Sequence, residues 1–578
     1  MLKRLAIYLK GYEKYAVGSP LLVVLETGCE LVIPLLMAQI INKGIYGNSM
    51  TVIWQSGALM VLVALLATVI GGWAARCAAY AAQGLGANLR QAEFEKITAF
   101  SFADIDRFSS SSLITRLTND LTNIQNVAIM CLRVLIRGVT MTVASVILTL
   151  SLSPKLALVV CVVLPFMAAA LGLLMKICFP LFEKMQKTLD HLNETVQENL
   201  IAVRVVKSYV REDRERAKFM DANDGFTAAG MQAVLRMVAI QPVMMICFAV
   251  ATVLVLYNGG NMVLGGELEI GYLQTVIGYI MQILMSAMMI GMAVLQYTRA
   301  QASIRRVFEV LDADSAITDG GESAPPAPQG RVEFRDVSFR YQTDGAGEDV
   351  LRGVNLEVKP GEFVAIVGGT GTGKSSLVNL IPRFYDVHRG KVLVDGLDVR
   401  DYALDDLRGR IGMVLQNNVL FSGTIRENLL WGNENATEEE LIQAAKDAQA
   451  YDFIMTFPEG FDTYLEQGGV NVSGGQKQRL CIARAMVRKP SVLILDDSTS
   501  AVDSATEGRI RESFRENLKG TTVIIIAQRI SSVQYADKIV VLDEGTVADV
   551  GSHDELMQTS RIYREIYDSQ QEGGDENG

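Results

Sequence analysis

Six long apolar stretches dominate the first half of the chain. They lie at residues 16–44, 52–82, 127–151, 155–180, 237–262 and 272–299. Each exceeds the roughly 20 residues that a helix needs to cross a hydrocarbon core of ~30 Å. Because backbone groups inside a bilayer must be bonded within their own element, stretches of this kind form helices. The sequence therefore predicts an all-α membrane domain with six spans.

The basic residues of this half predict its orientation. Two long polar connections, after the second and fourth stretches, contain Arg90, Lys96, Arg107, Arg116, Lys184, Lys187, Arg204, Lys207, Arg211, Arg214, Arg216 and Lys218. The other connections are short and hold few cations, such as Lys43 and Lys155. Since basic loops stay in the cytoplasm, we expect a multi-pass protein of the cytoplasmic membrane with both termini inside the cell. The amphipathic N-terminal segment, which lacks the pattern of a cleaved signal, is expected to lie on membrane lipids.

The second half has a different texture. Residues 312–330 gather Gly, Pro and Ser, which indicates a linker after a membrane domain over 1–311. From residue 331 to 570, short β-branched runs alternate with helical segments, so we expect a cytoplasmic α/β domain with a mainly parallel sheet. The tail 571–578 is expected to be disordered.

Charge argues against a nucleic-acid partner, and cysteine spacing argues against a zinc site or a disulfide framework. The net charge of -11 and the lack of Lys and Arg runs argue against a nucleic acid. The seven cysteines lack metal-ligand spacing and lie mostly in apolar stretches, so we expect neither a zinc site nor a disulfide framework.

A phosphate-binding loop follows the apolar run "FVAIV". Its residues, with the serine that follows, are Gly368, Gly369, Thr370, Gly371, Thr372, Gly373, Lys374, Ser375 and Ser376. The glycines let backbone N–H groups surround a phosphate, Lys374 supplies a cation, and the Ser375 hydroxyl can ligate Mg²⁺. This spacing between a strand and a helix predicts a nucleotide site.

A second anion-binding pattern is "NVSGGQKQR", where Ser473, Gly474, Gly475 and Gln476 begin a helix. With these motifs the chain resembles an exporter-type half-transporter of the ATP-binding cassette (ABC) family, in which a six-helix membrane domain is fused to an α/β ATPase domain. The resemblance implies that ATP and Mg²⁺ are the cofactors and that residues 473–476 bind the ATP held by a second subunit.

The resemblance also assigns roles to four further residues. Tyr341 would stack on adenine, Gln416 would reach the metal and the membrane domain, and Asp496 would hold Mg²⁺ through water. Asp503 would lie in the loop that crosses the dimer interface.

Two positions depart from the family's pattern. Asp497 stands where the family has a catalytic Glu, and Gln528 where it has a His. Shortening the acid withdraws the carboxylate, and misplacement on the order of 1 Å can cost ~100-fold in rate. A Gln cannot carry a proton. The pair predicts a site that binds ATP but hydrolyses it poorly, in a heterodimer whose second half-transporter subunit has the intact Glu and His.

Coupling to cargo is predicted by resemblance alone. The segments Asp106 to Asp120 and Glu198 to Glu212 resemble the family's two coupling segments.

The expected cargo is an amphipathic drug or lipid. The alternatives are a lipid or peptide exporter and a regulatory subunit that drives no transport. Met281, Met285, Met288 and Met292 either line the cavity or face lipid and neighbouring helices. Glu26 and Glu30 either attract cationic cargo or pair with Arg76, Arg133 or Arg137.

Overall fold

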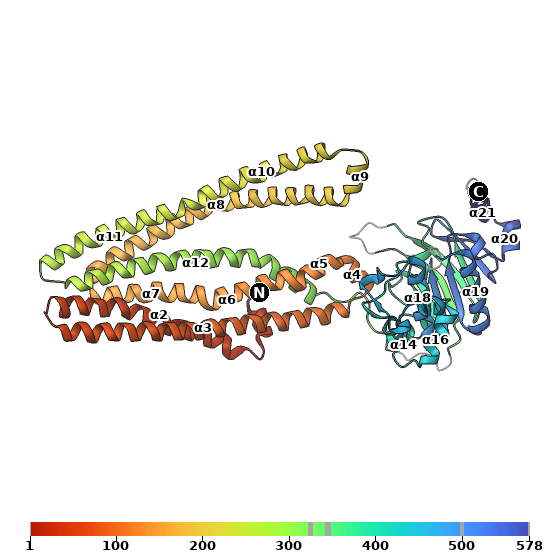
Figure 1. Cartoon of the computed structure of the whole chain (residues 1–578), viewed down its shortest axis with the longest axis horizontal. Coiled ribbons are helices and arrows are strands. Elements are labelled where there is room, and N and C mark those ends of the chain that lie inside the picture. The colour runs from red at the N-terminus through yellow and green to blue at the C-terminus, as the bar shows by residue number, and fades with distance from the viewer. Residues whose placement is uncertain (1, 322–327, 342–347, 498–501, 576–578) are drawn as a thin grey trace. The chain divides into compact units, whose positions relative to one another are not determined.

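The chain folds into two compact units in the computed structural model, which describes residues 2–321, 328–341, 348–497 and 502–575. The membrane unit comprises residues 1–98 and 111–313, and the nucleotide unit comprises residues 99–110 and 314–578 (Figure 1). The nucleotide unit thus includes a short segment from between the second and third apolar stretches.

In the residues that the structure describes, the membrane unit contains helices and no strands. They are α1 (Leu2–Leu5), α2 (Glu13–Gln39), α3 (Met50–Thr98), α5 (Ser110–Thr115), α6 (Leu121–Ile129), α7 (Ile136–Leu152), α8 (Pro154–Ile201), α9 (Val203–Ser208), α10 (Glu212–Val238), α11 (Ile240–Leu264) and α12 (Ile270–Leu311). In the described part of the chain, six continuous helical segments are long and apolar enough to cross a membrane, which confirms the predicted number of spans.

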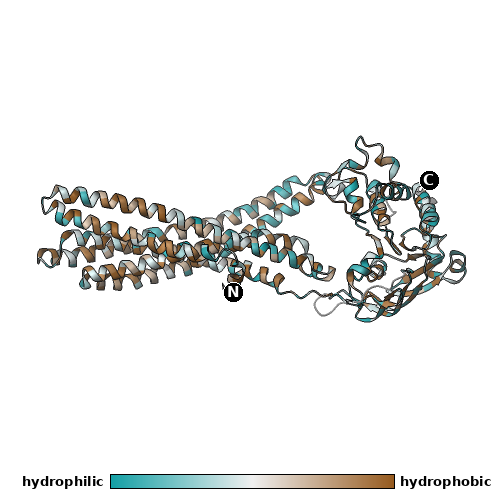
Figure 2. Cartoon of the chain, turned by 90° about the horizontal axis from the view of Figure 1, so that it is seen from below, coloured by the Kyte–Doolittle hydropathy of each residue, from teal (hydrophilic) through white to brown (hydrophobic). Residues whose placement is uncertain are grey.

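Several of these helices extend far beyond a bilayer. The 49 residues of α3 cover about 73 Å at 1.5 Å per residue, more than twice the ~30 Å of a hydrocarbon core. Figure 2 shows the apolar residues of this unit concentrated toward one end of the bundle and hydrophilic residues toward the other. The polar extensions of α3, α8 and α10 are the connections that the sequence predicts to be basic loops.

An ion triad joins two helical segments within the membrane unit. Arg137 Nη1 lies 3.0 Å from Glu26 Oε1, and Arg137 Nη2 lies 2.6 Å from Glu30 Oε1. The sequence left Arg76, Arg133 and Arg137 as possible partners. In the structure Arg137 contacts both glutamates. Charges in apolar surroundings need such pairing, which favours a structural role for both glutamates.

The nucleotide unit contains two main sheets. The antiparallel sheet has the order β2-β1-β4-β5, from β2 (Leu351–Val358), β1 (Val332–Phe339), β4 (Arg389–Val394) and β5 (Leu397–Asp398). The second sheet has the order β12-β11-β3-β10-β9-β6, from β12 (Thr546–Gly551), β11 (Lys538–Asp543), β3 (Phe363–Val367), β10 (Thr522–Ile526), β9 (Val492–Asp496) and β6 (Ile411–Val414). All its neighbours pair in parallel except β11 and β12. A two-stranded pair, β7 (Gly423–Thr424) and β8 (Tyr464–Leu465), completes the strands.

Helices of the nucleotide unit pack with these sheets. They are α4 (Phe102–Phe108), α13 (Lys374–Asn379), α14 (Leu404–Gly409), α15 (Ile425–Leu430), α16 (Glu438–Asp447), α17 (Tyr451–Ile454), α18 (Gly474–Val487), α19 (Ser504–Asn517), α20 (His553–Thr559) and α21 (Arg561–Asp575). Strands β3, β9 and β10 are buried throughout and form the centre of the core. Their continuous apolar runs are those of a parallel sheet covered on both faces.

Helix α4 belongs to the nucleotide unit because its side chains dock there. The Phe102 ring stacks on Phe384 with centroids 4.3 Å apart, and the Tyr385 hydroxyl donates to Asp106 Oδ2 at 2.7 Å. The Ser101 and Asp104 side chains cap the helix N-terminus reciprocally. The helix begins four residues before the segment that the sequence predicts to be the first coupling element, and residues 99–110 fall outside the membrane unit for this reason.

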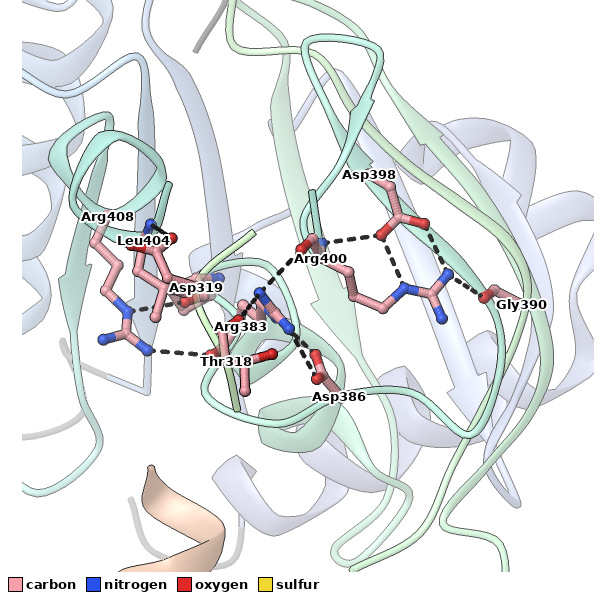
Figure 3. Close-up of polar contacts among 10 residues, drawn as sticks. Thr318, Asp319, Arg383, Asp386, Gly390, Asp398, Arg400, Leu404 and Arg408 are labelled. Carbon is pink, nitrogen blue, oxygen red and sulfur yellow. Dashed lines mark hydrogen bonds and ion pairs between the residues drawn. The ribbon is translucent and has the colours of Figure 1, made fainter. Parts of the chain in front are cut away.

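The segment predicted to be a linker, residues 312–330, is hydrogen-bonded to the rest of the nucleotide unit in its described part. The buried Arg383 guanidinium donates from Nη1 to the carbonyl oxygens of Thr318 at 3.0 Å and Arg400 at 3.1 Å, and pairs with Asp386 (Figure 3). Asp319 Oδ1 accepts from the Leu404 N–H at 3.1 Å. Composition favoured a linker here, but it carries no information on these distant partners.

The C-terminal helix also runs further than expected. Helix α21 continues to Asp575, five residues into the predicted disordered tail, while residues 576–578 lie outside the described residues. Tyr563 is fully buried, and Ile562, Ile566 and Tyr567 pack against the core. This apolar face anchors the helix, and propagation extends it because adding a residue is less costly than nucleation.

Candidate nucleotide site

The phosphate-binding loop connects the buried strand β3 to helix α13, as its spacing predicts. Gly368, Gly371 and Gly373 have φ of 155°, 83° and 94°, values that residues with a Cβ rarely adopt. A Cβ at Gly368 would lie 2.2 Å from the carbonyl oxygen of Leu542, and one at Gly373 would lie 2.9 Å from Leu351 Cδ2. The glycines are therefore required by both backbone conformation and close packing.

Lys374 and Ser375 are placed at the start of α13 with their polar atoms near the loop. Lys374 Nζ donates to the carbonyl oxygens of Gly368 at 3.0 Å and Gly369 at 2.6 Å. Burial lowers the pKa of the Lys374 ammonium, and the nearby carboxylates of Asp496 and Asp497 oppose this effect. An arriving phosphate would supply the anion that the partly desolvated ammonium needs. Thr372 Oγ1 donates to the Gly369 carbonyl at 3.0 Å and steadies the turn.

Asp496 ends strand β9 directly opposite the start of α13. Ser375 Oγ donates to Asp496 Oδ1 at 3.0 Å. Burial is the main cause that raises the pKa of Asp496, and the Asp497 charge adds to it, while the Ser375 hydrogen bond lowers it. A serine hydroxyl beside a buried carboxylate is the kind of hard oxygen donor set that Mg²⁺ prefers, so these residues fit that ion.

Asp497 and Gln528 contact each other at the ends of neighbouring strands. Strand β10 pairs with β9 through Ile526 and Asp496, which brings the residues that follow into reach. Gln528 Nε2 donates to Asp497 Oδ2 at 2.6 Å. Burial raises the pKa of Asp497, and the Gln528 hydrogen bond partly offsets this. Asp497 has φ of 49°, a left-handed conformation that Asp and Asn adopt more readily than longer side chains.

Gln416 and Tyr341 flank this group from two further strands. Gln416 is exposed two residues beyond β6, whose Val414 pairs with Leu495 of β9, so it lies at the same sheet edge as Asp496. The Tyr341 hydroxyl and Ser376 Oγ lie 2.9 Å apart, and the Tyr341 ring meets Tyr385 edge-on at 5.1 Å. Tyr341 is therefore at the loop, with one ring edge already packed.

The remaining predicted residues lie at other helix ends. Ser473 Oγ accepts from the Gln476 N–H at 3.3 Å, and Gln476 Oε1 accepts from the Ser473 N–H, which caps the 14-residue helix α18. Asp503 caps α19 by accepting from the Thr506 N–H, which lowers the Asp503 pKa. In the described part of the chain, no hydrogen bond or ion pair that we find joins residues 473–476 to the loop 368–375. Ser473 and Gly474 at the start of α18 are exposed, and Gly475 and Gln476 are half-buried.

Two residues near the site have no signal in the sequence. Gln570 of α21 donates from Nε2 to the Gln528 carbonyl at 2.7 Å and accepts from the Ile530 N–H at 2.9 Å, so it holds the backbone on both sides of Arg529. Tyr385 packs on Tyr341 and bonds to Asp106 of α4. Neither belongs to a motif, and each reaches the site from a distant part of the chain.

Comparisons with known proteins agree with this geometry. Residues 18–288 match the family model for the ABC transporter transmembrane region, and residues 351–500 match the model described as ABC transporter. YfiB of Bacillus subtilis, an uncharacterized ABC transporter ATP-binding protein, is 38% identical over 563 residues, 97% of each chain. YgaD of the same species, whose name gives multidrug export as a provisional function, is 34% identical over 587 residues, 98% of this chain and 99% of its own.

A solved structure extends the match to the whole fold. A bacterial Atm1-family ABC exporter with ATP bound superposes with a TM-score of 0.81 at 26% identity, over 97% of this chain and 99% of that one. The six spans and these relatives indicate a multi-pass membrane protein, and the ATPase unit implies ATP binding. The chain therefore belongs to the ABC transporter family, as an exporter half-transporter that is a transport ATPase.

Proposed function

We propose that this chain is the degenerate-site subunit of a heterodimeric exporter that moves amphipathic drugs or lipid-like compounds outward across the cytoplasmic membrane. Its own site binds ATP and hydrolyses it slowly, and its residues 473–476 complete the active site of the partner subunit. The observation that carries the proposal is the 2.6 Å hydrogen bond from Gln528 Nε2 to Asp497 Oδ2.

This hydrogen bond ties together the two residues that would act on the attacking water. ATP hydrolysis needs a carboxylate that orients or deprotonates a water in line with the γ-phosphate. Burial raises the pKa of Asp497 and so does not make it a weaker base, and the deficit that we propose is one of position. Its side chain would end further from the phosphate than that of a Glu, and one of its oxygens already accepts a hydrogen bond from Gln528.

Binding of ATP is served by residues that follow the family's pattern. Lys374 would turn from the Gly368 and Gly369 carbonyls to the phosphates, and Tyr341 would pack on adenine. Ser375 and Asp496 would hold Mg²⁺ with Gln416, and the ion would neutralise phosphate charge. The groups that bind ATP are retained, whereas the carboxylate that would act on water is misplaced. This combination favours a site that binds ATP and hydrolyses it slowly.

Two exposed surfaces support a partner subunit. The exposed Ser473 and Gly474 leave the start of α18, with the positive end of its dipole, accessible to an anion held by another chain. Around α9, Leu200, Tyr209 and Val210 are 67%, 73% and 80% exposed, more than apolar side chains tolerate without a covering partner. These residues belong to the second segment that resembles a coupling element.

The direction and cargo of transport rest on the basic connections and on the relatives. The basic polar connections favour a cytoplasmic ATPase unit and cytoplasmic termini. The name of YgaD supports multidrug cargo. A regulatory subunit is the second candidate, because the exposed start of α18 and the hydrogen bond on Asp497 would also suit a chain that binds ATP only to stabilise the dimer.

The test is ATP turnover of the chain alone and with co-expressed half-transporters, using Asp497→Glu, Gln528→His and the double variant. We expect the chain alone to be nearly inactive and a partner to restore turnover. Because the two side chains are bonded, the double variant should gain more than the two single variants combined. Brisk turnover by the chain alone would overturn the degenerate site. Drug transport that survives Lys374→Ala but stops when the partner's catalytic Glu is replaced would favour the regulatory subunit.

A further inference from the structure

A large apolar pocket lies within the membrane unit between α8 and α12. Its volume is about 580 Å³, within the usual range for pockets that hold small molecules. Met167, Met175 and Phe179 of α8 and Ile290 of α12 contribute apolar lining, and Thr142 of α7 lies at one side. The methionines that line it are not those of the α12 series, since Met281, Met285 and Met292 are 44%, 51% and 60% exposed outside it.

Among the described residues that line this pocket, Lys176 is the only charged one. Among the described residues no carboxylate is paired with its ammonium. Other cations of the same unit do have partners: Arg137 pairs with Glu26 and Glu30, and Lys155, at the opposite end of α8, lies 2.7 Å from Glu267. Lys176 is exposed, so its ammonium is accessible from the pocket, and it is the position where a ligand's negative charge would be compensated.

The two threonine hydroxyls that line the pocket already form hydrogen bonds within the protein. Thr142 Oγ1 donates to the Gly138 carbonyl at 2.9 Å and lies 2.8 Å from Ser286 Oγ. Thr298 Oγ1 donates to the Val294 carbonyl at 2.9 Å. Within the described lining, the Lys176 ammonium is therefore the group with donors to spare, and no lining carboxylate is present to receive a cation.

The depth of Lys176 also suits an amphiphile. It lies four residues before Pro180, the last residue of the apolar stretch 155–180, which is about 6 Å along the helix. The ammonium thus stands near one polar boundary of the membrane, while Met167 lies about 13 Å deeper along α8. A ligand with an acidic head at the boundary and an apolar body along α8 matches this gradient.

We propose that this pocket binds a single-chain or drug-sized amphipathic anion, with its acidic group on Lys176 and its apolar body against Met167, Met175 and Phe179. The proposal rests on the export function proposed above, because it names the chemical class of the cargo. It disfavours cationic amphiphiles, which would bring their charge against the ammonium. The acidic group could be a carboxylate or sulfonate of a free amphiphile or the phosphate of a bilayer lipid; we assign the free amphiphile.

The test compares two fluorescent probes that differ by a sulfonate. 1-Anilinonaphthalene-8-sulfonate and neutral N-phenyl-1-naphthylamine would be titrated onto the full chain, with its partner subunit, in phosphatidylcholine nanodiscs. We expect Lys176→Met to weaken sulfonate binding at least tenfold and to leave the neutral probe unchanged, while Lys176→Arg retains both. Lys155→Met is the matched control and should change neither probe.

Two results would overturn the proposal. Equal loss of both probes in Lys176→Met would mean that the lysine only shapes the pocket. Weak sulfonate binding to the unmodified chain, together with co-purified phospholipid that Lys176→Met releases, would assign the site to a bilayer lipid. The binding assay requires no turnover. Sulfonate binding through Lys176 without ATPase stimulation or transport would therefore refute the export function alone, and drug transport unaffected by Lys176→Met would refute this site alone.

Discussion

Asp497 has a left-handed backbone conformation, and its partly buried carboxylate is destabilising when ionised. Its left-handed φ of 49° suits Asp or Asn, and burial raises its pKa above the ordinary value of 3.8. A raised pKa means that the folded chain binds the proton more tightly than the unfolded chain. The free energy of unfolding therefore falls as pH rises from the ordinary carboxyl pKa through the raised one, and the ionised carboxylate remains a cost at neutral pH.

Asp497→Asn should remove this cost without straining the turn. We expect the melting temperature of the nucleotide-free chain to rise by about 2 °C at pH 8, and the gain to shrink as pH falls toward the ordinary carboxyl pKa. Asp503→Asn is the control of opposite sign, because its pKa is lowered by the Thr506 N–H and its charge stabilises the fold at neutral pH. Melting curves at pH 5 and pH 8 check both. A lower melting temperature for Asp497→Asn at pH 8 would contradict the assignment.

Helix α4 is a short element whose position depends on two aromatic contacts. It has seven residues, too few to be stable alone, so the stacking of Phe102 on Phe384 and the bond from Tyr385 to Asp106 hold it in place. Tyr385 also packs on Tyr341, the residue expected at adenine. A continuous chain of side chains thus runs from α4 to the nucleotide site within one unit.

Phe102→Ala should loosen α4 while leaving the phosphate-binding loop intact. An aromatic pair contributes about 1 kcal/mol beyond its buried area, so we expect a modest loss of stability. Nucleotide affinity should stay within twofold, and stimulation of ATPase activity by transported drugs should fall several-fold. Phe94→Ala is the matched control, since Phe94 is 58% exposed on α3. Unchanged drug stimulation in Phe102→Ala would show that α4 transmits no signal.

At the scale of the whole molecule, the contribution of an ion pair to stability differs between the two units, because water screens charges in one and apolar surroundings do not in the other. In the nucleotide unit, exposed pairs such as Lys489 with Glu440 are screened by water and contribute little. In the membrane unit, Arg137 serves two acids, one of which, Glu26, is 5% exposed. Removing one partner there leaves charges without compensation, which costs far more than a surface pair.

Arg137→Met should destabilise the membrane unit by roughly 3 kcal/mol, because Glu26 and Glu30 would remain charged beside each other. Arg133→Met, one turn away, is the control; among the described contacts that we find, Arg133 makes no ion pair. Thermal aggregation in detergent checks the difference. Adding Glu26→Gln and Glu30→Gln to Arg137→Met should recover most of the loss. Equal melting of the two arginine variants would refute a structural role for the triad.

Features set by local constraints were accessible from the sequence. The six spans follow from the length of apolar helix that a bilayer requires, and the phosphate-binding loop follows from glycines at adjacent positions between a strand and a helix. The unusual Asp497 and Gln528 are visible as single letters, and the resemblance to ABC exporters placed them at one site. Their roles in ATP turnover stay predictions.

Only the tertiary structure decided the contacts between residues far apart in the chain. It chose Arg137 among three arginines, attached residues 318–319 to Arg383 and Leu404, and brought Gln570 to the backbone beside Gln528. Among the described residues, it also placed Lys176 at an apolar pocket whose lining contains no carboxylate. Such pairings depend on how complete helices and sheets pack, and their energies are summed over many distant side chains. Local pattern determines which elements form, whereas packing determines which of their polar groups meet.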